Sequence, residues 1–327
     1  MLSQSSFAQA EFAAKKRTTR REKFLGEMER VVPWARLIEL IKPFYPTGRR
    51  GRPPIGIERM LRIYFLQQWY GLSDEGLEDA IYDIQSMRLF AGIDLGADAV
   101  PDATTLLNFR HLLEEHGLTK AIFLEVNALL GERQLLMKEG TIVDATIIAA
   151  APSTKNKAKE RDPQMHQTKK GNQYYFGMKA HIGADMESGL VHTVTTTAAN
   201  VADITETHKL LHGEESVAFA DAGYIGVEKR EEIIAAHAQV EFIVGAKRSK
   251  IKALPAGPLK DAKLALEKVK AQVRAFVEHP FHILKNLFRY RKARYRGLAK
   301  NYAQLHTLFA LANLVIAKNS LLNPTKA

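Results

Sequence analysis

The sequence contains no cysteine among its 327 residues. This absence excludes disulfides and thiolate metal sites, and it fits a protein that works in a reducing compartment. The N-terminus lacks the apolar core of a secretory signal peptide. The most apolar late stretch, residues 305–317, is too short to span a bilayer and contains Asn313. We therefore expect a soluble, cytoplasmic protein.

Acidic residues are outnumbered by basic ones. Lys and Arg total 47 against 36 Asp and Glu, a formal net charge of +11. A charge of this size concerns partners rather than fold, and polyanions such as nucleic acids are the first candidates. From charge alone, a nucleic-acid-binding protein and a merely basic cytosolic protein stay equally open. Because 46% of the residues are hydrophobic, global disorder is excluded.

The first part of the chain, residues 1–135, has the periodicity of helices. Gly71 stops one apolar run, whereas Ser73 and Asp102 are N-caps for the next two helices. The expected helices are residues 57–70, 74–84, 102–115 and 118–130. Basic clusters lie at 15–23 and 49–52. The pattern predicts an all-helical DNA-binding region with a basic N-terminal arm suited to phosphate contact.

The helices at 74–84 and 102–115 would form a unit of helix-turn-helix type. The second helix would then offer several polar side chains to a DNA groove: Thr104, Thr105, Asn108, Arg110 and His111. A plain helical bundle that docks on the following domain is the alternative, and the basic arm would then be a solvated tail.

The periodicity changes at Gly140, where a short β-branched run indicates a buried strand. The expected strands are 141–148, 173–184, 190–197, 216–220 and 241–244, and the expected helices are 201–211, 224–237 and 258–320 with an interruption near Pro280. Residues 152–171 have the composition of a loop. Residues 136–320 are thus expected to form a mixed α/β sheet with helices on both faces.

Three carboxylates stand out in this second region. Asp144 lies in the middle of an apolar strand, where an unpaired carboxylate needs a cation or strong donors. Asp221 directly follows a strand, at the edge where ligand-binding groups of α/β sheets collect. Glu278 lies near a helix end. Taken singly, each residue also has a purely structural explanation. Asp144 would bond to nearby backbone at a strand end, Asp221 would form a turn beside glycine, and Glu278 would belong to a solvent-exposed helix face.

Two geometries are open around Glu278. In one continuous helix, Arg274, Glu278 and Lys285 share a face. Pro280 disfavours this continuity, and the alternative is a helix that restarts at Pro280. Both versions keep Glu278 near a helix end.

Together the three carboxylates would repel one another unless divalent cations neutralised them. Oxygen-only ligands, with neither cysteine nor a histidine pair at metal spacing, favour Mg²⁺ or Mn²⁺ over zinc. Two such ions about 3.5–4 Å apart would suit an in-line phosphoryl transfer.

Three segments resemble the catalytic signatures of the DDE transposases of bacterial insertion sequences. They are Val143–Thr146, Ala220–Tyr224, and the spacing from Arg274 through Glu278 to Lys285. Residues 177–181, 197–203 and 49–54 further resemble the insertion-sequence-five branch, so that the likeness covers about residues 25–320. One departure is Ala271, where the superfamily places a tyrosine. Only 57 positions separate Asp221 from Glu278, which leaves little room for the β-rich insertion that many relatives carry.

The resemblance implies an RNase H-like fold and a bacterial, nucleoid-associated transposase with Asp144, Asp221 and Glu278 as metal ligands. Such an enzyme binds the terminal inverted repeats of its element, cleaves the ends and joins the 3′-OH to target DNA, as a dimer or larger assembly. Arg274 and Lys285 would hold flanking phosphates. The segment 289–296 interleaves Arg291, Lys292 and Arg294 with two tyrosines. The cations would bind phosphates and the rings would stack on unpaired bases. The alternative is a basic helical face with half-buried tyrosines and no role in DNA binding.

Two other functions share these features. An RNase H-like nuclease or junction resolvase would need the triad but no end-reading domain. A DNA-binding regulator with a decayed catalytic domain is the third reading, and the presence of all three acidic residues argues against it.

Overall fold

The computed structural model describes residues 14–48, 53–137, 139–157 and 159–323. The chain divides into two units. Unit 1 runs to Leu118 and takes in the chain from Lys318 onward, and unit 2 spans Thr119–Ala317. Helix α8 (Leu118–Glu132), which the sequence grouped with the N-terminal region, thus falls almost wholly in unit 2. The basic cluster at 49–52 lies outside the described residues.

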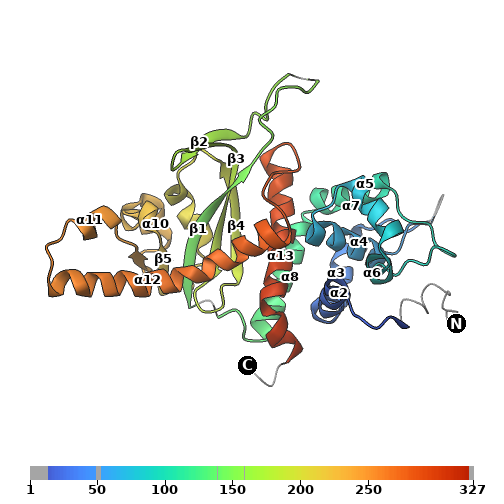
Figure 1. The fold of residues 1–327 in the computed structure, drawn as a ribbon, viewed down its shortest axis with the longest axis horizontal. Coiled ribbons are helices and arrows are strands. Elements are labelled where there is room, and N and C mark those ends of the chain that lie inside the picture. Colours follow the sequence, from blue (N-terminus) through green and yellow to red (C-terminus); the bar gives the residue numbers. More distant parts are fainter. Residues whose placement is uncertain (1–13, 49–52, 138, 158, 324–327) are drawn as a thin grey trace. The chain divides into compact units, whose positions relative to one another are not determined.

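Unit 1 is built of helices, as predicted. In chain order they are α2 (Arg20–Val31), α3 (Trp34–Ile41), the 3-10 helix η1 (Lys42–Phe44), α4 (Ile57–Tyr70), α5 (Asp74–Asp83), α6 (Gln85–Phe90) and α7 (Ala103–Glu115) (Figure 1). The predicted caps are present. Ser73 accepts a hydrogen bond from the Gly76 N–H and Asp102 one from the Thr105 N–H, whereas Gly71 ends α4 in the left-handed conformation.

Part of the expected basic arm is helical. Arg20 begins α2, and Thr19 and Glu22 form a capping box at its start. Lys15 pairs with Glu22 at 2.8 Å. The capping box therefore places the second half of the arm in a helix.

Unit 2 contains a mixed sheet. Its strands are β1 (Gly140–Ala149), β2 (His166–Lys170), β3 (Gln173–Asp185), β4 (Val191–Ala198), β5 (Val217–Ala220) and β6 (Glu241–Val244). The central strand β1 pairs antiparallel with β3 and parallel with β5, and β5 pairs parallel with β6. Both β2 and β4 pair antiparallel with β3, β2 with its first half and β4 with its second. This arrangement is the predicted RNase H-like sheet (Figure 1).

Helices flank this sheet. They are η2 (Asp203–Glu206), α9 (Thr207–Leu210), η3 (Ala222–Tyr224), η4 (Val227–Lys229), α10 (Glu231–Ala236), α11 (Arg248–Lys252), α12 (Pro258–His282), η5 (Ile283–Leu287) and α13 (Leu298–Leu322). Val143, Ala218 and Ala220 share a buried cluster with Leu210 of α9 and Ile233 of α10. These helices therefore cover one face of β1 and β5, and α12 runs alongside the same two strands (Figure 1).

Strand β2 lies inside the segment that was expected to be a loop. A two-residue turn, Gly171-Asn172, joins it to β3, and Gly171 has φ +61°. Gly-Asn between alternating residues is a hairpin signal. The polar composition of the segment concealed it.

The expected interruption at Pro280 is wrong. Helix α12 continues through Pro280 to His282 and then widens into the π-helix η5. Proline removes one N–H from the helical ladder, and π-turns are a recognised way for a helix to adjust its register.

Helix α13 is longer than the apolar stretch seen in the sequence. By length and composition alone it would suffice to cross a membrane, but 61% of its apolar window is buried in the fold, as in a core helix. The buried Asn313 accepts a hydrogen bond from the Val191 N–H at 2.9 Å and donates to Val191 O and to Asn127 Oδ1. One amide thus ties α13 to α8 and to the start of β4.

We predict that Asn313→Leu lowers the free energy of unfolding of the full-length protein by about 2–4 kcal/mol, because buried polar groups of Val191 and Asn127 lose their partner. Denaturant unfolding followed by circular dichroism measures the change. The control Asn319→Leu, at an exposed position of the same helix, should shift stability by less than about 0.5 kcal/mol. Equal losses in both variants would contradict the assigned role.

Candidate active site

Asp144 lies within β1, and Asp221 directly follows the adjacent strand β5. The parallel register of β1 and β5 pairs Ile142 with Phe219. Two residues further along each strand, this register places Asp144 beside Asp221. The Asp221 side chain accepts a hydrogen bond from the Gly223 N–H at 2.7 Å, which turns the chain sharply into η3. Parallel pairing alone therefore brings two carboxylates together at one sheet edge.

The ionisation of Asp144 reflects this crowding. Its Oδ1 accepts a hydrogen bond from the Ala145 N–H at 2.8 Å. The pKa of Asp144 is raised to about 6, chiefly by burial and also by the negative charges of Asp221 and Asp203, whereas the Ala145 N–H and the Arg274 cation act in the opposite direction. Burial and two neighbouring carboxylates thus disfavour the charged form of Asp144.

Two buried polar groups beside these carboxylates lack partners. Within the described chain, Tyr224 Oη and Arg274 Nε have no hydrogen-bond partner. Burial, followed by the charges of Asp144, Asp203 and Asp221, raises the pKa of Tyr224 well above its ordinary value. Unsatisfied buried donors are uncommon in folded proteins and mark places where a ligand or ion completes the bonding.

Asp203 was not singled out by the sequence as a site residue, although it ends a segment that carried the family resemblance. Lys179 of β3 pairs with it at 2.8 Å, and His181 Nδ1 lies 3.8 Å from the same oxygen. The charge of Asp203 acts on both Asp144 and Tyr224. It is therefore a fourth carboxylate in the electrostatic surroundings of the site, held by its own lysine.

Glu278 lies on α12 beside a groove of about 510 Å³ that Ile147 of β1 and Lys285 also line. Its side chain is exposed. Lys285 Nζ donates to Ile147 O at 2.9 Å, and burial, with the nearby Lys170 and Arg291 cations, lowers the pKa of Lys285. The structure thus brings Asp144 and Asp221 together and places Glu278 along an adjoining groove.

The tightest metal-ligand geometry among the described residues belongs to another group. Ligand atoms of His192, His212 and Glu215 lie within 4.8 Å of one another, near Thr141 at the start of β1. Glu215 already accepts hydrogen bonds from Thr141 and from the backbone N–H groups of His212 and Gly213. These bonds account for the buried carboxylate as part of the fold, and the proposed triad is not grouped as closely.

A basic cleft of about 660 Å³ opens next to Asp221 and Arg274. Its other cations come from α11 and α12: Arg248, Lys252, Lys260, Lys268 and Lys270. A cleft with this excess of positive charge suits a polyanion that passes the carboxylates.

The polar face proposed on α7 is only partly available. Thr104, Asn108 and His111 are exposed and Thr105 is half-buried. Arg110 is buried and forms a bidentate pair with Asp74 at 2.8 and 3.0 Å. The proposal that Arg110 contacts DNA is therefore wrong, because its guanidinium joins α7 to α5.

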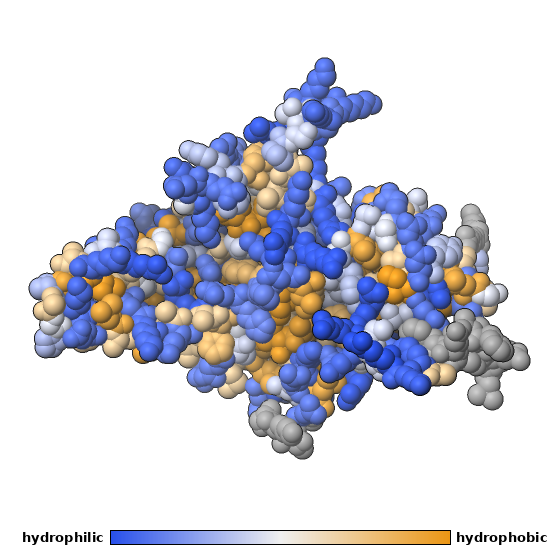
Figure 2. Space-filling model, in the orientation of Figure 1, coloured by the Kyte–Doolittle hydropathy of each residue, from blue (hydrophilic) through white to orange (hydrophobic). Residues whose placement is uncertain are grey.

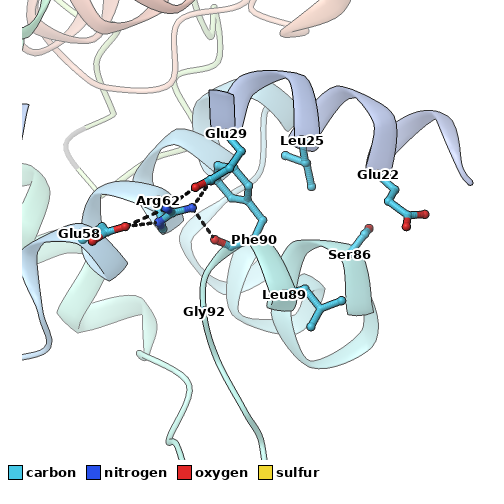
Figure 3. Close-up of a pocket in the computed structure, with 10 residues that line it drawn as sticks. Glu22, Leu25, Glu29, Glu58, Arg62, Ser86, Leu89, Phe90 and Gly92 are labelled. Carbon is cyan, nitrogen blue, oxygen red and sulfur yellow. Dashed lines mark hydrogen bonds and ion pairs between the residues drawn. The ribbon is translucent and has the colours of Figure 1, made fainter. Parts of the chain in front are cut away.

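The two helices of the expected helix-turn-helix unit pack against each other. A tight turn does not join them, because α6 lies in the connecting segment. A pocket elsewhere in unit 1 is lined by Glu22, Glu29 and Glu58, and Arg62 is held by two of these glutamates (Figure 3). Such a lining makes this pocket unsuitable for a phosphate.

The basic segment after η5 differs from expectation in one residue. Tyr290 is 1% exposed and donates to Asn301 Oδ1 at 2.9 Å, so it is unable to stack on a base. Arg291, Lys292 and Arg294 are exposed. Lys292 forms a β-bridge with Ala149, which fixes these cations at the end of β1.

Comparisons with known proteins agree with this geometry. Residues 136–314 match a family model described as the transposase DDE domain, and residues 12–112 match one described as a transposase domain (DUF772). A cryo-EM structure of the piggyBac transposase synaptic complex with hairpin DNA has 10% sequence identity and a TM-score of 0.44, covering 91% of this chain and 73% of that chain. That likeness is too distant to carry a functional argument. The DDE-domain match spans more than half of the chain and includes Asp144, Asp221 and Glu278, so the chain belongs to the DDE transposases.

Proposed function

We propose that the protein is the transposase of a bacterial insertion sequence. It binds the terminal inverted repeats of its element, cleaves the DNA ends and joins the freed 3′-OH to target DNA. The observation that carries this proposal is the crowded pair Asp144 and Asp221, beside the unsatisfied Arg274, in a chain of the DDE family. The motif resemblance favours the insertion-sequence-five branch, and hence a cytoplasmic, nucleoid-associated protein.

Asp144, Asp221 and Glu278 are proposed to hold two divalent cations, Mg²⁺ or Mn²⁺. The raised pKa of Asp144 supports this assignment, because added positive charge would relieve the crowding. Carboxylate oxygens are the ligands that these hard cations prefer. When bound, the ions stabilise negative charge on the attacking and leaving oxygens of phosphoryl transfer.

Arg274 and Lys285 are proposed to position the DNA backbone. Arg274 has a buried guanidinium nitrogen available to a phosphate. Lys285 is oriented by its bond to Ile147 O, which leaves further donors of the ammonium group for a phosphate. The two cations therefore hold the DNA backbone on either side of Glu278 along α12.

Residues 1–135 are proposed as the end-recognition domain and residues 136–320 as the catalytic domain. The compact units divide at Leu118, so α8 would belong physically to the catalytic part. Recognition is assigned to the exposed face of α7, and basic residues supply phosphate contacts. Because two ends are processed together, we infer at least a dimer when the ends are paired.

Conservative substitution of each triad residue should abolish strand cleavage. Asp144→Asn, Asp221→Asn and Glu278→Gln keep the side-chain shape but remove a charged ligand, and we expect cleavage of an element-end duplex to fall by at least about a hundredfold in Mg²⁺. Binding to the same duplex should persist. The measurements are gel-based cleavage, strand transfer and equilibrium binding with full-length protein.

Asp261→Asn is the matched control, since Asp261 is exposed in the first turn of α12 and should leave cleavage unchanged. A triad variant with near-normal cleavage would remove that residue from the proposed site. Cleavage without strand transfer in the unmodified protein would favour a nuclease over a transposase.

The raised pKa of Asp144 predicts how stability depends on pH without metal. Below about pH 4 this carboxyl is protonated in both the folded and unfolded states, so its ionisation does not lower the free energy of unfolding. Between about pH 4 and pH 6 the unfolded chain has released this proton while the folded protein retains it, so stability falls across this window, and above about pH 6 the full penalty of the buried charge is present. In EDTA, Asp144→Asn should thus be more stable than the unmodified protein by up to about 3 kcal/mol at pH 8, and the difference should vanish near pH 4.

Denaturant unfolding from pH 4 to pH 8 measures this difference, with Asp261→Asn as control. Added Mg²⁺ should stabilise the unmodified protein more than Asp144→Asn. A difference that is the same at both pH limits would show that charge crowding is not its cause.

The exposed face of α7 should determine preference for the element end. The triple variant Thr104→Ala, Asn108→Ala, His111→Ala is expected to bind the end and unrelated duplex equally, because base contacts are lost while phosphate contacts remain. Competition gel shifts at several salt concentrations test this, with Asp79→Asn on α5 as the exposed control. A triple variant that keeps the end preference would place recognition on another surface.

A further inference from the structure

The hairpin of β2 and β3 extends past the end of β1 as a two-stranded ribbon. Pairing between β1 and β3 stops at Ala149 and Gly177, whereas β2 pairs with β3 over Gln173–Gly177. A two-stranded ribbon has little stability of its own. Figure 2 shows hydrophilic residues gathered over this region and over the loop that projects beside it. The ribbon therefore presents a polar surface next to the carboxyl end of β1.

A large aromatic ring stands exposed on this ribbon. Tyr174 is 62% exposed, and Lys169, its cross-strand partner, lies over the ring at 5.5 Å from the centroid. On the same face of β3, Arg161 lies over the ring of Phe176 at 5.3 Å. An exposed ring among cations combines a flat apolar face with positive charge, the two properties that bind bases and phosphates.

The ribbon continues the groove at Glu278. That groove is lined by Tyr175 and Ala149 as well as by Lys285 and Arg291. The same Tyr175 and Ala149 line a second hollow of about 450 Å³, together with Tyr174, Arg161 and Lys292. Because they share two lining residues, the hollows lie side by side, and we call the surface that they form together from Glu278 to Tyr174 the path. Four cations and one carboxylate border it, so that the path suits a polyanion.

We propose that this path binds a single DNA strand next to the cleavage site, with an unpaired base stacked on Tyr174. Arg161, Arg291 and Lys292 hold the phosphates, and Lys285 marks the end that adjoins Glu278. The sequence suggested such a role for the tyrosines of segment 289–296; Tyr290 is buried, and the ribbon supplies the exposed ring instead. The inference rests on the proposed function for the identity of the strand.

A binding experiment on cleavage-deficient protein tests this site. Full-length Asp144→Asn protein in EDTA is titrated into a short single-stranded oligonucleotide that carries 2-aminopurine, and both anisotropy and base fluorescence are recorded. Adding Tyr174→Leu, which keeps apolar area but removes the ring, should weaken binding about tenfold and abolish the fluorescence quenching caused by stacking. Tyr174→Phe keeps the ring and should behave as the parent.

Two further variants keep the test decisive. Tyr82→Leu alters another exposed tyrosine, on α5, and should change nothing. Lys292 lies outside the ribbon, so the result for Lys292→Gln does not depend on whether Tyr174→Leu folds. This variant should bind the oligonucleotide more weakly, and the slope of log affinity against log salt concentration should become shallower by about 0.7.

Unchanged affinity and quenching in Tyr174→Leu, or an unchanged salt slope in Lys292→Gln, would overturn the proposal. Loss of affinity in Tyr174→Phe equal to that in Tyr174→Leu would also overturn it, since the ring would then not be the cause. No cleavage enters these measurements. If the triad variants cleaved DNA normally, the proposed function would be refuted while single-strand binding at Tyr174 could still hold. If Tyr174→Leu bound the oligonucleotide normally, this inference would be refuted while the proposed function could still hold.

Discussion

The structure of the catalytic unit depends on one unfavourable interaction, the approach of two carboxylates at neighbouring positions of β1 and β5. Parallel pairing places Asp144 beside Asp221, and burial makes the repulsion costly, as the pKa of about 6 at Asp144 shows. Functional sites commonly carry such a cost, and under the proposed function the same negative charge would attract divalent cations. The surrounding residues are arranged around this excess of negative charge.

Helix α12 supplies most of the compensating charge. It places Arg274 near the carboxylates, Glu278 one turn further, and Lys285 in the π-turn that follows. Because the π-turn holds one more residue than an α-turn, it rotates the residues beyond it, and Lys285 donates to the backbone of β1. The helix therefore runs along β1, the strand that carries Asp144. Two basic surfaces lie next to this helix. One is the cleft beside Asp221, and the other is the path that leads to the ribbon.

Strand alternation, caps and turn residues were sufficient to predict the helical unit, the mixed sheet and the positions of Asp144 and Asp221 at its edge. They were sufficient because these features depend on local periodicity and on side chains that bond within a few residues, as at Ser73 and Asp102. The family motifs then indicated the acidic residues. The roles of Asp144, Asp221 and Glu278 as metal ligands stay predictions.

What the sequence alone determined about this protein is most of its secondary structure, with β2 and the course of the chain at Pro280 as exceptions, together with its family and its chemical class. Contacts between distant residues were decided by tertiary structure. Arg110 looks like a DNA-contacting cation until Asp74, on another helix, pairs with it, and Tyr290 looks available until Asn301 accepts its hydroxyl. The continuity of α12 through Pro280 likewise depends on packing, which outweighs the loss of one hydrogen bond. Local patterns state what a side chain is able to do, whereas burial and long-range partners decide whether it is free to do it.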